Sequence, residues 1–259
     1  MGSYKMKHKG GGYGKSAKAS EGNLSQNLFS NSLNTPLVSV ITAILNGEKY
    51  LKDCIESVLS QSYPNIQHII VDGGSTDNTI EILNTYNDKL AVWVSEPDAG
   101  IYSAINKGIH LSKGDFYIVL GCDDTLMPNA IEVLISRIES KLAICGLASL
   151  IDRNDNHKSL IYAHSAGTLI RTSAHQEVGF YDESYKIAAD TKFLQKIRIR
   201  GGLLKINEVV GNFRDGGISS SYRKTIKEHA RAMQEAGAWG RLRSLVWLVP
   251  RMLYSNIRK

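Results

Sequence analysis

The sequence has few cysteines, few prolines and no long apolar run. Only three of its 259 residues are cysteine and five are proline. Cys54, Cys122 and Cys145 are odd in number and lack the spacing of metal ligands or redox pairs, so neither a disulfide framework nor a zinc site is indicated. No stretch reaches the roughly 18 apolar residues of a spanning helix, and the Lys/Gly/Ser-rich N-terminus has no signal-peptide core. We therefore expect a cytoplasmic protein.

Positive charge is concentrated at the two ends of the chain. The formal net charge is +6 and the pI is about 9.1. Residues 1–35 carry five lysines and one glutamate, and residues 223–259 carry nine lysines and arginines against two glutamates, so residues 36–222 have a net charge of −5. A nucleic-acid-binding protein would carry its basic stripe on the folded domain. The distribution argues against a nucleic-acid partner and favours flexible or membrane-facing tails.

From Leu37 onward, apolar runs alternate with helical periodicity, a pattern typical of a parallel sheet with crossover helices. Strands are expected at 37–45, 68–71, 90–95, 116–120, 142–150 and 203–210. Helices are expected between 47 and 63, around Ile80 and Leu83, at 101–112, after a first-turn Pro128, and at 190–199 with Asp190 as its cap. After residue 150 the pattern becomes irregular until 190. The sequence predicts an α/β domain at 36–222, a disordered segment or tag at 1–35 and a helical extension at 223–259.

Acidic residues directly follow two of the predicted strands. Asp72 ends the strand at 68–71, and Asp123 and Asp124 follow the strand at 116–120. Ligands of open parallel sheets bind outside the carboxyl ends of the strands. Carboxylates there would repel a nucleotide diphosphate unless a divalent cation lay between them, and Mg²⁺ or Mn²⁺ binds few carboxylates together with phosphate oxygens. The paired acids therefore indicate a metal beside a nucleotide diphosphate.

Each acidic group also has a purely structural interpretation. Asp123 and Asp124 can cap the helix that follows, although two adjacent acids exceed what one cap requires. Asp72 can be a turn aspartate, and the GGSTD segment at 73–77 a capped helix start. That turn is neither a P-loop nor a dinucleotide fingerprint. Position alone leaves both interpretations open.

Several linked motifs resemble glycosyltransferase family 2. They are VSVITAILN (38–46), SVLSQSYPNIQHIIVDGGSTDNT (57–79), SEPDAGIYSAINKGI (95–109), GDFYIVLGCDD (114–124), HSAGTLIRTSAHQEVGFYDESYKIAAD (164–190) and FRDGGISSSY (213–222). The resemblance covers residues 36 to about 225. It implies a GT-A fold with a mostly parallel central sheet flanked by helices and a C-terminal helical extension. It also implies an inverting mechanism and a nucleotide-diphosphate sugar donor, with a UDP-sugar expected.

The resemblance also implies roles for individual residues. The donor-binding residues would be Thr42, Glu48, Asp72, Asn106 and Asp123, with Asp72 meeting the base and Asp123 near the ribose and the metal. Asp124 would be the direct ligand of Mn²⁺ or Mg²⁺. Asp190 would be the general base, a role compatible with that of a helix cap, and His164 would contact the acceptor or the diphosphate unless it is a structural histidine.

Four positions depart from the family pattern or lack a role in it. Gly121 stands where the family often has Asn, Ser or Asp, so a side-chain contact is absent there. Thr191 and Lys192 follow Asp190 where another acid or an aromatic residue is usual. Arg214, although able to bind phosphate, is expected at the solvated surface.

The last 37 residues predict a basic, amphipathic helix. Its apolar face consists of Leu242, Leu245, Val246, Val249, Met252 and Leu253. Such a helix can lie in a membrane interface and meet anionic lipid, or it can dock on its own domain with a kink at Pro250. The first arrangement would place the protein on the inner face of the plasma membrane.

The leading hypothesis is a hexosyltransferase-type enzyme acting on a glycan or lipid-linked acceptor in polysaccharide, including lipopolysaccharide, biosynthesis. The alternative is a nucleotide-sugar binding or scaffolding protein without catalysis. Only the departures at Gly121, Thr191 and Lys192 favour that alternative.

Overall fold

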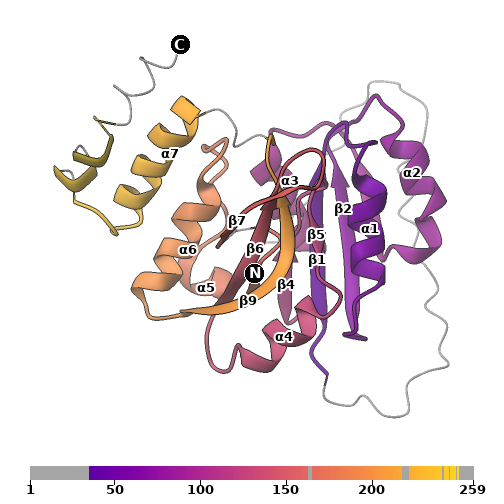
Figure 1. Ribbon diagram of the computed structural model, residues 1–259, viewed down its shortest axis with the longest axis horizontal. Helices are drawn as coiled ribbons and strands as arrows, with labels where there is room; N and C mark the ends of the chain where they lie inside the picture. Colours follow the sequence, from indigo (N-terminus) through magenta and orange to yellow (C-terminus); the bar gives the residue numbers. More distant parts are fainter. Residues whose placement is uncertain are drawn as a thin grey trace, which may run out of the picture.

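The computed structural model describes residues 35–162, 165–217, 222–240, 242–244, 246–248 and 250. In this part of the chain, one curved sheet of nine strands lies between two layers of helices (Figure 1). The strand order is β3-β2-β1-β4-β8-β6-β9-β5, and β7 pairs with the outer part of β6.

The first half of the sheet is parallel. It consists of β1 (Val38–Ile44), β2 (Ile66–Asp72), β3 (Val92–Ser95) and β4 (Phe116–Val119). β1 pairs in parallel with both β2 and β4, and β2 pairs with β3. Helices cover both faces of a parallel sheet, so its central strands need apolar residues on both sides. The run VSVITAI of β1 meets that need, because six of its seven residues are buried.

The second half of the sheet is mixed. It consists of β5 (Thr125–Leu126), β6 (Ala143–Ile151), β7 (His157–Ile161), β8 (Thr168–Arg171) and β9 (Leu203–Arg214). β8 is antiparallel to β4 and β6, whereas β6 and β9 run parallel to each other. Because β8 reverses direction between them, β4 and β6 point the same way. Their carboxyl ends therefore lie at the same end of the sheet.

The helices form two layers and one outlying element. They are α1 (Leu51–Leu59), α2 (Thr79–Thr85), η1 (Asn87–Lys89), α3 (Ile101–Leu111), α4 (Ala130–Arg137), α5 (Ala174–Val178), α6 (Ala189–Ile199) and α7 (Tyr222–Glu235). Side chains of α1 and α4 share one apolar cluster with the sheet, and side chains of α3, α5 and α6 share another on the opposite face. α7 packs against α6, away from the sheet (Figure 1).

The predicted α/β fold, with a mostly parallel central sheet flanked by helices, is confirmed. The prediction of irregular structure after residue 150 is wrong, because β7, β8 and α5 lie there. Two helices begin at other residues than predicted: α4 begins at Ala130, beyond Pro128, and α6 begins at Ala189, so Asp190 lies in the first turn and is not the cap.

The N-terminal segment 1–34 and most of the predicted amphipathic helix after residue 240 lie outside the described residues. α7 falls within the predicted helical extension. Within the described ranges, no helix combines the length and the apolar character needed to cross a bilayer.

Candidate functional site

The site lies at the carboxyl ends of β1, β2, β3 and β4, which the parallel pairing brings to one end of the sheet. Four loops meet there, and they follow these four strands. Ligand sites of open α/β sheets occupy this position. The sequence prediction of acidic residues at these strand ends can therefore be checked loop by loop.

Asp123 and Asp124 form the turn that follows β4. The Asp124 side chain is only 2% exposed, and its carboxylate accepts hydrogen bonds from Ser165 Oγ at 3.0 Å and from the backbone N–H of Arg214 at 2.9 Å. Asp123 is half-buried beside it. The chain thus places two adjacent carboxylates in a turn with little access to water. One of them, Asp124, accepts two hydrogen bonds.

The charges of this pair are poorly compensated. Burial, followed by the charge of Asp123, raises the pKa of Asp124 to about 7. Burial also raises the pKa of Asp123, although the Arg214 charge opposes that shift. The charge of Arg214 opposes the pKa shift of both carboxyl groups but does not offset it. A cation bound at this turn would supply the missing positive charge.

Gly121 leaves space for such a cation. A Cβ atom placed on Gly121 would lie 2.7 Å from Asp124 Oδ2 and 3.0 Å from Asp123 Oδ1. Both carboxylates therefore turn toward a position that is open because residue 121 has no side chain. The departure from the family pattern is thus part of the site. Carboxylate oxygens with spare lone pairs suit Mg²⁺ or Mn²⁺, so the residues fit the predicted metal, although the described residues contain no group of three or more His, Cys, Asp or Glu side chains arranged as a metal site.

Arg214 ties this turn to the rest of the sheet end. Its guanidinium donates to the backbone oxygens of Asp123 and Asp152, both at 3.2 Å, and pairs with the Asp155 carboxylate at 2.6 Å. It also stacks over the Tyr50 ring, 4.5 Å from its centroid. At 7% exposure Arg214 is buried, so its predicted place at the solvated surface is wrong. One sequence signal could have indicated that Arg214 is buried, namely that it closely follows a segment predicted to be a strand. In the sheet, Arg214 pairs with Ile151.

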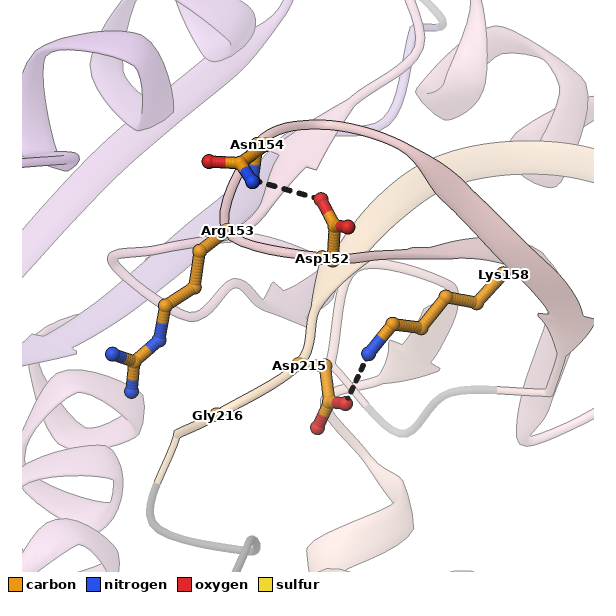
Figure 2. A pocket seen from close by; sticks show the side chains of 6 residues that line it. All are labelled: Asp152, Arg153, Asn154, Lys158, Asp215 and Gly216. Atoms are coloured by element: carbon orange, nitrogen blue, oxygen red, sulfur yellow. Dashed lines mark hydrogen bonds and ion pairs between the residues drawn. The ribbon is translucent and has the colours of Figure 1, made fainter.

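A pocket of about 290 Å³ adjoins Arg214 between the β6–β7 turn and the end of β9. Figure 2 shows that Lys158 points to Asp215, that Asp152 lies by Asn154, and that Arg153 points away from them. Lys158 and Asp215 form an ion pair of 2.8 Å. Because Lys158 and Asp215 neutralise each other, we assign the chemistry of the site to Asp123 and Asp124.

Asp72 is buried within its own loop. It is 0% exposed, and its carboxylate accepts hydrogen bonds from the N–H groups of Gly74 and Ser75, from Ser75 Oγ and from Ser95 Oγ. These donors hold the loop after β2 in place. These bonds agree with the turn-aspartate interpretation, and the contact of Asp72 with the base stays a prediction.

Thr42 is likewise a core residue. It is 0% exposed, and its hydroxyl lies 3.2 Å from His68 Nε2. His68 is itself buried, and burial lowers its pKa to about 3, so the histidine stays neutral. In this structure Thr42 contacts core residues, and its place in a nucleotide pocket stays a prediction. Alternation along β1 puts Thr42 on the same face as Val38 and Val40, which pack into the core.

Glu48 lies in the loop between β1 and α1, at the predicted end of the sheet. Its backbone N–H donates to Asp77 Oδ2 at 3.1 Å, and its carboxylate accepts the N–H of Asn78 at 2.9 Å. The loops after β1 and β2 are therefore joined to each other. Glu48 is exposed, so its role in donor binding stays a prediction.

Asn106 is buried in α3 and binds the protein itself. Its amide nitrogen donates to the Tyr181 carbonyl oxygen and to Glu183 Oε1, and its amide oxygen accepts the Tyr181 N–H. All its amide groups are thus used to attach α3 to the segment before α6. These bonds give Asn106 a structural role, and its contact with the donor stays a prediction.

Asp190 lies in the first turn of α6, half-buried. Its Oδ1 accepts the N–H of Thr191 at 2.6 Å and lies 3.3 Å from the Tyr102 hydroxyl. Burial, and then the Asp190 charge, hold the pKa of Tyr102 well above its usual range, so this phenol stays protonated as a donor. Among the described residues, none donates a hydrogen bond to Asp190 Oδ2. This oxygen is therefore available to accept a proton from a substrate.

His164 lies outside the described residues, so its predicted contact with acceptor or diphosphate stays a prediction. Ser165, which follows it, donates to Asp124. The sequence analysis did not name Ser165, and it placed Arg214 at the solvated surface. Both contact Asp124 only because distant strands meet it in the fold.

Comparison with known proteins identifies the family. A family model described as "Glycosyl transferase family 2" matches residues 39–197, which is more than half of the chain. The chain belongs to glycosyl transferase family 2. The predicted family is thereby confirmed.

Curated relatives agree with this assignment. An uncharacterized glycosyltransferase of Rickettsia typhi is 31% identical over 193 residues, covering 64% of this chain and 58% of the relative. The glycosyltransferase GlyG of Streptococcus pneumoniae is 38% identical over 108 residues, covering 40% of this chain and 36% of GlyG. The chain thus spans less than two thirds of the length of these relatives.

Solved structures share the fold at low sequence identity. S. aureus TarS, residues 1–349 in complex with UDP-GlcNAc, matches with a TM-score of 0.64 at 16% identity, covering 83% of this chain and 71% of that chain. The mannosyltransferase PcManGT from Pyrobaculum calidifontis, in complex with GDP-Man and Mn²⁺, matches with a TM-score of 0.62 at 17% identity, covering 81% and 66%. The GT-A fold expected for a family 2 protein is confirmed.

Proposed function

We propose that this family 2 protein transfers a sugar from a nucleotide-diphosphate donor to an acceptor hydroxyl by a single inverting displacement that depends on Mn²⁺ or Mg²⁺. One observation carries the proposal. The two carboxylates of Asp123 and Asp124 lie dehydrated and without sufficient positive charge at the carboxyl ends of the parallel strands, and they face the open position at Gly121.

In this proposal Asp124 holds the divalent cation, and Asp123 lies beside it on the ribose side. When bound, the cation supplies positive charge that stabilises the departing nucleotide diphosphate. The Arg214 guanidinium binds the backbone oxygen of Asp123, while the Arg214 N–H and Ser165 Oγ both donate to the Asp124 carboxylate and orient it. The aspartate turn thereby keeps its shape whether or not the donor is present.

Asp190 acts as the general base. It accepts the proton of the acceptor hydroxyl as that oxygen bonds to the anomeric carbon, and the bond from that carbon to the diphosphate oxygen breaks. The hydroxyl becomes more acidic as it attacks, so a carboxylate is a sufficient base. Thr191 and Tyr102 both contact Oδ1, which directs Oδ2 to the acceptor.

The donor and acceptor follow from relatives and from the tail of the chain. Complexes of the structural neighbours contain UDP, UDP-GlcNAc or GDP-Man, which supports a nucleotide-sugar donor, and we propose UDP as the nucleotide. The acceptor would be a glycan or lipid-linked glycan of bacterial polysaccharide assembly. Leu242 and Val246 are 77% and 66% exposed, and such apolar side chains in a segment rich in arginine would suit peripheral contact with an anionic membrane.

The test uses UDP-GlcNAc and GDP-mannose as donor probes, each with and without Mn²⁺. A bound donor should raise the melting temperature, and release of the nucleoside diphosphate should follow with water or an added glycan as acceptor. Asp190→Asn should lose this turnover and keep donor binding, whereas the matched control Asp88→Asn, at an exposed position in η1, should keep both. Full turnover in Asp190→Asn would remove Asp190 as the base, and donor binding without turnover in the unaltered protein would support a non-catalytic binding protein.

A further inference from the structure

α7 lies outside the residues that match the family model, yet it contacts the segment that carries Asp190. The match ends at residue 197, and α7 spans Tyr222–Glu235. In Figure 1, α7 lies alongside α6 on the side away from the sheet. Its two glutamates, Glu228 and Glu235, lie about two turns of helix apart, and both contact residues between 182 and 192.

Glu228 binds three consecutive backbone N–H groups just before α6. Its carboxylate accepts the N–H of Lys186 at 3.1 Å, that of Ile187 at 2.7 Å and that of Ala188 at 3.1 Å. Successive N–H groups that converge on one anion form a concave binding site for negative charge. Here a side chain of the same protein fills that site.

These bonds fix the backbone at the start of α6. Ala188 is the N-cap residue of α6 and has no side-chain hydrogen bond of its own to cap the helix. On the other side of the segment, the Tyr102 hydroxyl contacts the Ile187 carbonyl oxygen and Asp190. The backbone that leads into Asp190 is thus held between Glu228 on α7 and Tyr102 on α3.

Glu235 on α7 binds Lys192, which lies two residues after Asp190 in α6. Lys192 pairs with Glu235 at 2.6 Å and with Asp182 at 2.7 Å, and its side chain is only 14% exposed. The Tyr185 hydroxyl and Arg231 also bind Glu235. The unusual lysine near the base is therefore directed to α7.

From these contacts we infer that Glu228 is a positioning residue for Asp190, so that α7 belongs to the catalytic unit of this protein. This inference rests on the proposed role of Asp190 as the base. Displacement of a reacting group by about 1 Å can lower a rate by about 100-fold. Loss of the Glu228 bonds would therefore lower turnover without altering donor binding. The proposed donor site lies at the carboxyl ends of β1 to β4, whereas Glu228 contacts the segment before α6.

The test is a double-substitution cycle. Glu228→Gln keeps the size of the side chain but removes the anion, and it is expected to lower turnover of the donor probe by about 10- to 100-fold with an unchanged donor Kd. In the Asp190→Asn background the same change should cost nothing further, because Glu228 acts through Asp190. Glu228→Asp should recover part of the activity, and the exposed Glu177→Gln on α5 is the matched control.

Hydrogen exchange supplies a measurement that needs no turnover. In Glu228→Gln the amides of Lys186, Ile187 and Ala188 should exchange faster, whereas those of β1 and β4 should keep their protection. Unchanged exchange at these three amides overturns the inference. So does an equal loss of turnover when Glu228→Gln is introduced into the unaltered protein and into Asp190→Asn. Full activity of Asp190→Asn alone refutes the proposed base, while altered exchange with unaltered turnover in Glu228→Gln refutes only the positioning role.

Discussion

Asp72 and Asp124 both follow a strand of the parallel half of the sheet, and both are buried, but their surroundings differ. Asp72 receives hydrogen bonds from two N–H groups and two hydroxyl groups of nearby residues. Asp124 receives two hydrogen bonds and has a second carboxylate beside it. A carboxylate whose oxygens are saturated by its own loop maintains structure, whereas one with unused capacity and a like charge nearby is suited to bind a cation.

The largest effect is expected for Asp124→Asn. Without the second carboxylate, the cation should bind far more weakly and turnover of the donor probe should fall by about 1,000-fold or more. The substitution removes a buried charge that Asp123 repels, which offsets the loss of one of the two hydrogen bonds that Asp124 accepts, so the protein should still fold. The measurement is nucleotide release together with the Mn²⁺-dependent rise in melting temperature. A loss of turnover below about tenfold would contradict the metal-binding role.

Asp72→Asn should affect stability and leave the Mn²⁺ response intact. The amide nitrogen of asparagine cannot accept the N–H and hydroxyl donors that now meet the carboxylate, so we expect a loss of about 2 kcal/mol in the free energy of unfolding. Urea unfolding measures this loss. If stability were unchanged and donor affinity fell instead, Asp72 would contact the nucleotide after all.

Gly121→Ala tests the open space in front of the aspartate pair. The new Cβ would lie 2.7 Å from Asp124 Oδ2, so both carboxylates must turn away. We expect Mn²⁺ affinity to fall by about tenfold, as measured by calorimetry. Gly240→Ala, where nothing lies within 4 Å of an added Cβ, is the control, and equal Mn²⁺ affinity in both variants would show that the cation binds elsewhere.

The smallest effect is expected from pH. The pKa of Asp124 is raised from its ordinary value of 3.8 to about 7, so the folded protein holds a proton that the unfolded chain releases. Without metal, this group favours folding at low pH, and that contribution is lost as the pH rises from about 4 through 7.

Bound Mn²⁺ reverses this dependence, because it competes with the proton. Below pH 7 its affinity should fall by up to about tenfold per pH unit. The rise in melting temperature caused by Mn²⁺ should therefore be larger at pH 8 than at pH 6, and this difference should disappear in Asp124→Asn. A rise that is equal at both pH values in the unaltered protein would place the cation away from Asp124.

The sequence was sufficient to predict the parallel strands and the place of the aspartate pair. Apolar runs that end in acids are local features, and parallel pairing brings their ends together. It was not sufficient to separate Asp72 from Asp124, since both follow an apolar run. The difference comes from Ser95, Ser165 and Arg214, which reach these carboxylates from other strands and loops.

Burial of individual side chains was predicted least well. Thr42 was assigned to the nucleotide pocket because it lies near the end of β1, but strand alternation turns it to the face that packs on α1. The β7 strand was missed because its segment is short and mostly exposed, and β8 because it has only four residues, although three of them are buried. Their existence depends on pairing with β6, which no local pattern reveals.

The contacts that complete the site join residues far apart in the chain. Arg214 meets Asp124 across 90 positions, and Tyr102 meets Asp190 across 88. Closing such long loops is entropically unfavourable and slow compared with forming local turns. During synthesis, the first four strands can emerge and pair while the ribosome still holds β9 and α7. A nascent chain would thus be able to form much of its sheet before its site is complete. Activity would then begin only after translation has passed α7.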